Sequence, residues 1–333
     1  MTDYKFSAFE AKALMINLLC SKLFLLCPAD FTEASGSGAL ISVLLVYLIA
    51  FLFFGIYTKS DKEITLPVIK KGFGVIVSFL LLFSGAVTLN LLVYFSKITA
   101  YPNSPLAYLT VPFAVCMLLS SASGIKCIGK LHGFFVPVIY ILLVFLTVSS
   151  YNAFDFTNLT PVLGKGIPYV LKSGLFLLSS LFEVVIFLFL KQHIKGSYKK
   201  TVFSSLLISL LLYLVTISAF LLIGGKTPDL PLLSVIQSGS FRRTDSVFLL
   251  LYAISGMLYL SSVLYFAVHI FADSFSICEK KALTVPFGLI LTAFSGISFF
   301  NRNGQIFLSA LSRWLWLIPF VLPLIFRFFK ERR

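Results

Sequence analysis

Residues 246–271, SVFLLLYAISGMLYLSSVLYFAVHIF, form an apolar stretch of 26 residues without a single Asp, Glu, Lys or Arg. A helix needs about 20 apolar residues to cross the hydrocarbon core of a bilayer, so this stretch predicts a membrane-spanning helix. Similar runs recur along the chain. The predicted spans are residues 11–28, 38–57, 73–95, 106–122, 133–150, 167–190, 201–223, 246–271, 283–300 and 307–328. They predict an all-α membrane protein with about ten transmembrane helices.

The composition agrees with this prediction. Of the 333 residues 59% are hydrophobic and 12% are charged, and the mean hydropathy is +0.99. A soluble domain of this length could not bury so much apolar surface. No hydrophilic stretch is long enough for a separate domain, so residues 1–333 are predicted to form one transmembrane domain in the lipid bilayer.

The basic residues predict how the helices are oriented. The formal net charge is +14, but Lys and Arg are spread between the apolar runs, which argues against nucleic-acid binding. With the ten predicted spans, eighteen of them fall on the side that holds both termini and seven on the other side. Cytoplasmic segments carry such an excess, so both termini are expected in the cytoplasm.

Two charges inside predicted spans indicate a candidate site. Lys22 lies eleven residues after Ala11, and Glu183 lies eleven residues after Lys172, so both are about 16 Å deep in a core about 30 Å thick. A charge at this depth costs about 2.5–3.5 kcal/mol and therefore faces a cavity or a partner. Small, hydroxyl or aromatic residues flank both charges: Cys20, Ser21, Ser179, Ser180 and Phe182. Such flanks favour broken helices whose ends point at a ligand.

A zwitterionic amino acid would fit this site, with Lys22 facing its carboxylate and Glu183 its ammonium group. Two alternatives remain open. Lys22 and Glu183 could pair with each other and only join two helices. Lys22 could instead lie near the membrane interface and extend its charge to water.

Further polar residues on the 246–271 span are candidates for lining a pathway. Ser255, Tyr259, Ser262 and His269 share one helix face, which is also a common arrangement for helix packing. Elsewhere, His132 and His193 are expected in solvated cytoplasmic loops, and Asn90 is a deep polar residue whose partner the sequence does not name.

Enzyme signatures are missing from the sequence. There is no HExxH motif, no GxSxG motif and no phosphate-binding Gly-rich loop, and the five cysteines show no metal-binding spacing. We therefore expect no enzymatic activity, no cofactor and no metal site.

Five stretches match, in chain order, the pattern of one family. They are residues 23–45 (LFLLCPADFTEASGSGALISVLL), 124–131 (GIKCIGKL) with Pro137, 158–163 (NLTPVL), 182–184 (FEV) and 243–245 (RTD). Together they resemble the spore germination permease family, the B subunits of nutrient germinant receptors in the amino acid/polyamine/organocation transporter superfamily. Ser21 and Leu23 depart from that pattern, because the family tends to have Gly there.

The resemblance implies a 5+5 inverted-repeat bundle with broken first and sixth helices around a central site. It also implies a permease-like subunit in the inner membrane of the spore, which binds a small nutrient such as an amino acid and triggers germination. A-type and C-type germinant receptor subunits would be its partners. The alternative is an autonomous amino acid transporter coupled to protons or Na⁺, in which Lys22 replaces the coupling cation and Glu183 takes up the proton. A nutrient-opened ion channel is a third reading.

Overall fold

The computed structural model describes residues 4–24, 32, 35–59, 67–224, 235–236 and 244–300. The predicted span 307–328 lies outside these residues. The described part is built from helices, with one isolated β-bridge between Phe6 and Ile194.

The first helix, α1 (Ala8–Cys20), begins at a capping box. The Ser7 hydroxyl accepts from the Glu10 N–H at 3.2 Å, and the Glu10 carboxylate accepts from the Ser7 N–H at 2.9 Å, so two backbone donors at the helix start are satisfied. α-Helical geometry ends at Cys20, and residues Ser21–Phe24 continue as a 3₁₀-helix, η1. The change falls directly before Lys22.

A second interruption lies in the predicted span 167–190. Here α7 (Ile167–Ser180) stops at Leu181, which has φ −93° and ψ 17°. The 3₁₀-helix η5 (Phe182–Val185) follows and leads into α8 (Ile186–Leu190). Glu183 therefore lies between two α-helical segments. Both interruptions occur beside the deep charges, where broken helices were expected.

The remaining long helices are continuous. They are α3 (Ala39–Lys59), α4 (Pro67–Thr99), α5 (Leu106–Ala122), α6 (Ile125–Val148), α9 (Tyr198–Leu222), α11 (Thr244–Phe275) and α12 (Thr284–Phe300). Among the described residues, five helices are long and apolar enough to cross a membrane, and α5 is a shorter apolar helix. Large apolar side chains such as Leu52, Leu119 and Ile141 are exposed on their outer faces, as a lipid-facing surface requires.

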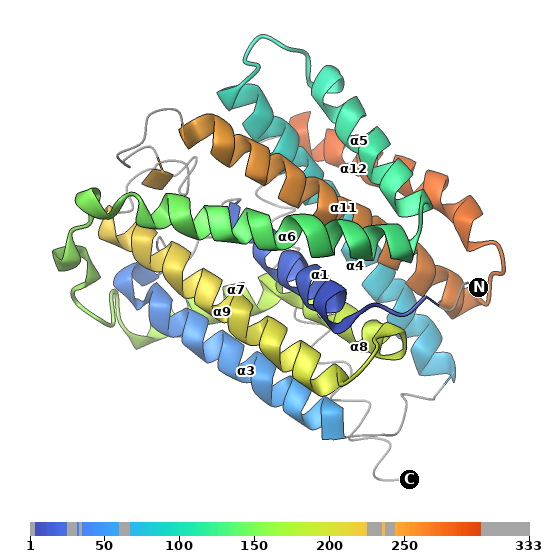
Figure 1. Ribbon diagram of the computed structural model, residues 1–333, viewed down its shortest axis with the longest axis horizontal. Coiled ribbons are helices and arrows are strands. Elements are labelled where there is room, and N and C mark those ends of the chain that lie inside the picture. Colours follow the sequence, from blue (N-terminus) through green and yellow to red (C-terminus); the bar gives the residue numbers. More distant parts are fainter. Residues whose placement is uncertain are drawn as a thin grey trace.

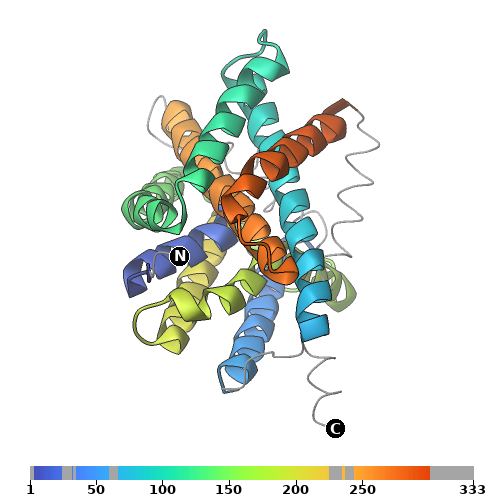
Figure 2. The same cartoon turned by 90° about the vertical axis from the view of Figure 1, so that its right-hand side faces the viewer.

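The helices pack around α1. Figure 1 shows α1 between α6, which lies above it with α11 beyond, and α9 and α3, which lie below it. The packing agrees with this view: α1 contacts α6, α9 and α11, while α4 packs along α11. Helices α5 and α12 cover the α4–α11 pair (Figure 2), and α7 packs against α3. The two interrupted segments therefore meet inside the bundle.

The prediction that His132 lies in a solvated loop is wrong. Helix α6 begins at Ile125, eight residues before the predicted start at residue 133, and His132 is fully buried within it. His193 does lie in a connection, at the end of the 3₁₀-helix Lys191–His193, and is half-buried there.

Candidate functional site

Lys22 and Glu183 form an ion pair where the two interrupted helices meet. The Lys22 Nζ atom lies 2.7 Å from Oε1 and 2.9 Å from Oε2 of Glu183. Lys22 is placed by η1, directly after the end of α1, and Glu183 by η5, directly after α7. Of the two alternatives that the sequence left open, the structure shows the direct pairing of the two charges, and the Lys22 side chain is buried.

Two hydroxyl groups complete the surroundings of Glu183. Ser84 of α4 donates to Oε1 at 3.0 Å, and the Tyr259 hydroxyl of α11 donates to the same oxygen. The two hydroxyl oxygens are 2.7 Å apart. We call Lys22, Ser84, Glu183 and Tyr259 the ion-pair cluster. It joins η1, η5, α4 and α11 through one carboxylate.

The ion-pair cluster is closed to solvent. Glu183 is 0% exposed and Lys22 is 6% exposed. Removing two charges from water is costly, and their mutual attraction offsets this cost only when further hydrogen bonds satisfy them. Ser84 and Tyr259 supply such bonds to Glu183. Removing one partner of a buried pair costs about 3–5 kcal/mol, because the other charge is left uncompensated.

A second group of buried polar residues lies between α1, α6 and α11. The Asn17 Oδ1 atom accepts from Ser255 Oγ at 2.9 Å and from the Tyr140 hydroxyl at 3.2 Å. The Asn17 amide nitrogen donates to the Ser255 carbonyl at 3.3 Å and lies 3.4 Å from His132 Nε2. Ser262 Oγ lies 3.3 Å from the same ring nitrogen. We call these five residues the Asn17 cluster.

Five of the predicted site residues belong to the two clusters. Lys22, Glu183 and Tyr259 belong to the ion-pair cluster, whereas Ser255 and Ser262 belong to the Asn17 cluster. Cys20 ends α1 and is buried, and the Ser21 hydroxyl beside it is buried with no hydrogen-bond partner in the described part of the chain. The backbone of Ser179 and Ser180 ends α7 and that of Phe182 begins η5, but their side chains lie outside the described structure.

Some residues around these clusters were not predicted. Ser84 is one of several hydroxyl residues in the apolar helix α4, and nothing in its sequence neighbourhood distinguishes it from a packing residue. His132 was expected in a loop, and Tyr140 lies in the predicted span 133–150 without a pattern that marks it as a site residue. His269 lies apart from both clusters, with Nδ1 2.9 Å from the Tyr265 carbonyl. Asn90, whose partner was unknown, donates to the Ser295 carbonyl at 2.9 Å and joins α4 to α12.

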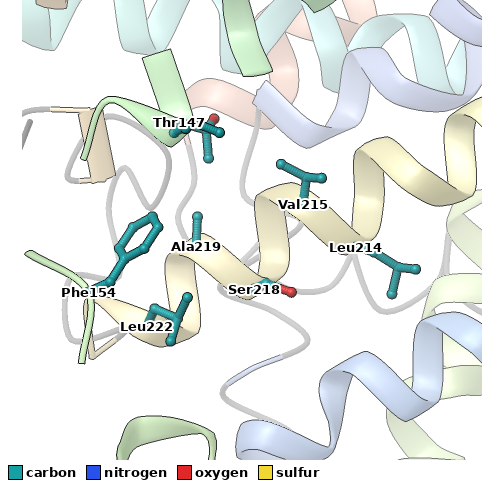
Figure 3. Close-up of a pocket in the computed structure, with 8 residues that line it drawn as sticks. Thr147, Phe154, Leu214, Val215, Ser218, Ala219 and Leu222 are labelled. Atoms are coloured by element: carbon teal, nitrogen blue, oxygen red, sulfur yellow. The ribbon is translucent and has the colours of Figure 1, made fainter. Parts of the chain in front are cut away.

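A cavity of about 290 Å³ lies elsewhere in the bundle. Figure 3 shows its walls, which come from the end of α6, from Phe154 and from the last turns of α9. The lining residues are Thr147, Val148, Phe154, Leu214, Val215, Ser218, Ala219 and Leu222. None of the predicted site residues contributes to it. In the described ranges, no group of three or more His, Cys, Asp or Glu residues is arranged to hold a metal ion.

Solved structures of transporters share this fold. The crystal structure of MhsT in complex with L-phenylalanine is similar with a TM-score of 0.67 and 17% identity, over 95% of this chain and 87% of that one. Mhp1, a nucleobase-cation-symport-1 family transporter solved in a closed conformation with bromovinylhydantoin bound, has a TM-score of 0.52 and 13% identity, over 92% of this chain and 66% of that one. At these identities the similarity establishes the fold alone. The predicted all-α membrane protein with a transporter-type bundle is confirmed.

Curated relatives share more of the sequence. Spore germination protein A2 of Bacillus subtilis (strain 168) is 24% identical over 356 aligned positions, which cover 96% of this chain and 95% of that protein. Spore germination protein XB of Bacillus anthracis is 23% identical over 181 positions, half of each chain. The family described as "Spore germination protein" matches residues 5–302, nearly the whole described chain. The resemblance inferred from five short stretches is thus confirmed, and this membrane protein belongs to the spore germination protein family.

Proposed function

We propose that this chain is a membrane subunit of a spore nutrient germinant receptor, and that it binds a zwitterionic nutrient such as an amino acid between Lys22 and Glu183. The observation that carries the proposal is the buried ion pair at the junction of two interrupted helices. Membership of the spore germination protein family supports the role in germination.

The chemistry of the pair selects for a zwitterion. A ligand that separates Lys22 from Glu183 exposes one positive and one negative group in a medium of low dielectric constant. An α-amino acid offers a carboxylate to the Lys22 ammonium group and an ammonium group to the Glu183 carboxylate. Both charges then remain paired. A simple amine or a simple carboxylate would leave one charge of the protein without a partner, which is costly in a buried site.

Binding at this place would also change the shape of the bundle. The pair is closed in this structure, so a ligand can enter only when η1 and η5 move apart. A ligand shifts such an equilibrium when its affinity differs between the two conformations. The conformation with the Lys22–Glu183 contact would be the resting state, and the conformation with a ligand between the two charges would be the signalling state.

The setting of this receptor follows from the family resemblance. The subunit would reside in the inner membrane of the spore with both termini in the cytoplasm, where most basic residues of the connecting segments lie. It would assemble with an A-type and a C-type receptor subunit and act without catalysis. These partners would respond to the change in conformation of the bundle.

Thermal unfolding of the full chain in lipid nanodiscs tests the site. Each of the twenty L-amino acids is added separately. A ligand present at 100 times its Kd stabilises the folded state by about 2.7 kcal/mol, which raises the midpoint measurably. The methyl ester and the des-amino analogue of each stabilising amino acid should have no effect at the same concentration. Equal stabilisation by the ester would contradict pairing of the ligand carboxylate with Lys22.

A double variant keeps this test interpretable. In Lys22→Met/Glu183→Gln both charges are removed together, so no uncompensated charge remains in the bundle. We expect this variant to fold and to lose the amino acid effect. A folded double variant that still responds like the wild type would place the ligand elsewhere.

The transporter fold favours a second candidate function, an amino acid transporter that works alone and is coupled to a cation gradient. Proteoliposomes that contain this chain alone separate the two functions. If the chain is a receptor subunit, we expect no accumulation of the labelled amino acid under a proton or Na⁺ gradient. If it is a transporter, we expect accumulation against the concentration gradient.

A further inference from the structure

The cavity between the ends of α6 and α9 takes no part in the ion-pair cluster or the Asn17 cluster. Its walls are the last turn of α6, the ring of Phe154 and the stretch of α9 from Leu214 to Leu222. Figure 1 shows the last turns of these two helices at the same end of the bundle. We call it the α6–α9 cavity.

The surroundings of the α6–α9 cavity are the hydrocarbon of the membrane. Both helices are long and apolar enough to cross a bilayer. The stretch from Leu214 to Leu222 covers about 12 Å of a helix that is about 37 Å long, so the cavity lies within one leaflet of a core about 30 Å thick. One turn from its walls, Phe145 and Leu211 are 56% and 54% exposed, as apolar side chains that face lipid are.

The walls of the α6–α9 cavity suit hydrocarbon better than water. Six of its eight lining residues are apolar, and the other two are Thr147 and Ser218. The Thr147 hydroxyl already donates to the Leu143 carbonyl at 2.7 Å. A buried water needs two to four polar partners, so it is poorly held here. Left unfilled, the cavity would deprive its wall atoms of dispersion contacts.

The size and shape of the α6–α9 cavity fit a segment of an alkyl chain. Apolar cavities of about 150 Å³ stay dry and bind benzene, and this one measures about 290 Å³. Its floor is formed by Thr147, Ala219 and Leu222, which are all buried. The ring of Phe154 packs against the cluster that contains Ala219 and closes one end (Figure 3). A chain in this cavity therefore contacts the interior of the bundle as well as its surface.

A second apolar groove provides a comparison within the same protein. It lies between α3 and α9 and measures about 360 Å³. None of the six residues that line it is buried, and Leu44 and Leu48 among them are 48% and 55% exposed. A chain in this groove touches only the outer surface of the bundle, so it should exchange as freely as the rest of the surrounding lipid.

We propose that the α6–α9 cavity is a lipid-binding site that retains one acyl chain of a bilayer phospholipid. The chain lies against Thr147 and Ala219, with its end toward Leu214 and the middle of the membrane. Its ester end leaves past Leu222 at the membrane surface. Helices α6 and α9 both pack against α1, so the retained chain supports the two helices that hold α1 in place.

Photo-crosslinking of the full chain in nanodiscs tests this site. The probe is a phosphatidylglycerol that carries a diazirine in the middle of one acyl chain, and the labelled residues are mapped by mass spectrometry. Figure 3 shows the Ala219 methyl group directed toward Thr147, so Ala219→Leu fills the cavity. We expect this variant to lower the labelling of residues 214–222 several-fold and to leave the labelling of residues 41–51 unchanged. Unchanged labelling of residues 214–222 in a folded variant would overturn the proposal.

Ala107→Leu is the matched control, because it adds the same volume at an exposed residue of α5. It should leave the labelling of both stretches as in the wild type. If Ala219→Leu does not fold, Ser218→Leu fills the same cavity from the neighbouring residue.

The rate of lipid exchange separates a retained chain from ordinary surrounding lipid. Unlabelled phosphatidylglycerol is introduced with cyclodextrin, and samples are irradiated at successive times. Labelling of residues 214–222 should decay several-fold more slowly than labelling of residues 41–51. Equal decay of the two would show that the cavity holds no lipid of its own, and the proposal would be overturned.

Discussion

The ring of Phe6 fills the space that Gly129 of α6 leaves open. A Cβ atom at position 129 would lie 2.5 Å from Cε1 and 2.6 Å from Cδ1 of Phe6. The backbone of Phe6 is also paired: its N–H donates to the His193 carbonyl at 2.7 Å, and its carbonyl accepts from the Lys195 N–H at 2.9 Å. The segment before α1 is thereby tied both to α6 and to the connection after α8.

Gly129→Ala should displace Phe6 and weaken this attachment. Inserting a methyl group into a filled site costs about 1–3 kcal/mol, because the ring and the backbone must shift. Thermal unfolding in nanodiscs should show a lower midpoint, and the Phe6 and Lys195 amides should exchange hydrogen faster. Gly55→Ala is the matched control, since no atom of the described residues lies within 4 Å of a Cβ atom there. Equal behaviour of the two variants would contradict the Phe6–Gly129 contact.

Glu183→Gln should destabilise the folded chain by about 3–5 kcal/mol, because the Lys22 ammonium group loses its counter-charge in a closed site. Adding Lys22→Met to this variant should recover part of the loss. The two changes and their combination form a double-mutant cycle, whose coupling energy is measured from the free energies of unfolding. Strictly additive losses would mean that the two charges do not depend on each other.

That the two charges lie inside the bundle could be predicted from the sequence. Lys22 and Glu183 each lie eleven residues into an apolar run, and the fixed rise of a helix converts this spacing into depth. The interruptions at Cys20 and Leu181 were also expected, because hydroxyl residues flank the charges. Local pattern was sufficient in these cases, since each depends on residues that are near in sequence.

The partners of these charges could not be predicted. Ser84 reaches Glu183 only because α4 is rotated so that this residue faces η5, and the several hydroxyl residues of this apolar helix do not specify that rotation. His132 was misplaced because Lys126 and Lys130 lower the hydropathy around it and moved the predicted start of the span to residue 133. In the structure α6 continues through these residues. Helix rotation and helix ends are set by tertiary packing.

Tyr259→Phe should weaken the ion-pair cluster, whereas Tyr252→Phe should not destabilise the protein. The Tyr259 hydroxyl donates to the Glu183 carboxylate, and hydrogen bonds to charged groups contribute about 1.5–3 kcal/mol. Tyr252 lies two turns earlier on the same helix. Its hydroxyl is buried and has no hydrogen-bond partner among the described residues. Removing it deletes an unsatisfied polar group. The free energy of unfolding should therefore be lower for Tyr259→Phe than for Tyr252→Phe, and the reverse order would refute the assignment.

Gly164→Ala should separate the segment before α7 from the turn before α3. Gly164 has φ +54°, and a Cβ atom there would lie 1.9 Å from the Ser35 carbonyl oxygen, which also accepts from the Lys165 N–H at 3.2 Å. Alanine would meet both a backbone cost of about 1–3 kcal/mol and a direct overlap. Gly196→Ala isolates the backbone cost, because Gly196 has φ +95° and no atom of the chain's described part lies within 4 Å of a Cβ atom there. We therefore expect Gly164→Ala to lower the unfolding midpoint more than Gly196→Ala and to speed hydrogen exchange at the Lys165 amide. Equal midpoints and an unchanged exchange rate would show that the Ser35–Gly164 approach does not hold these two segments together.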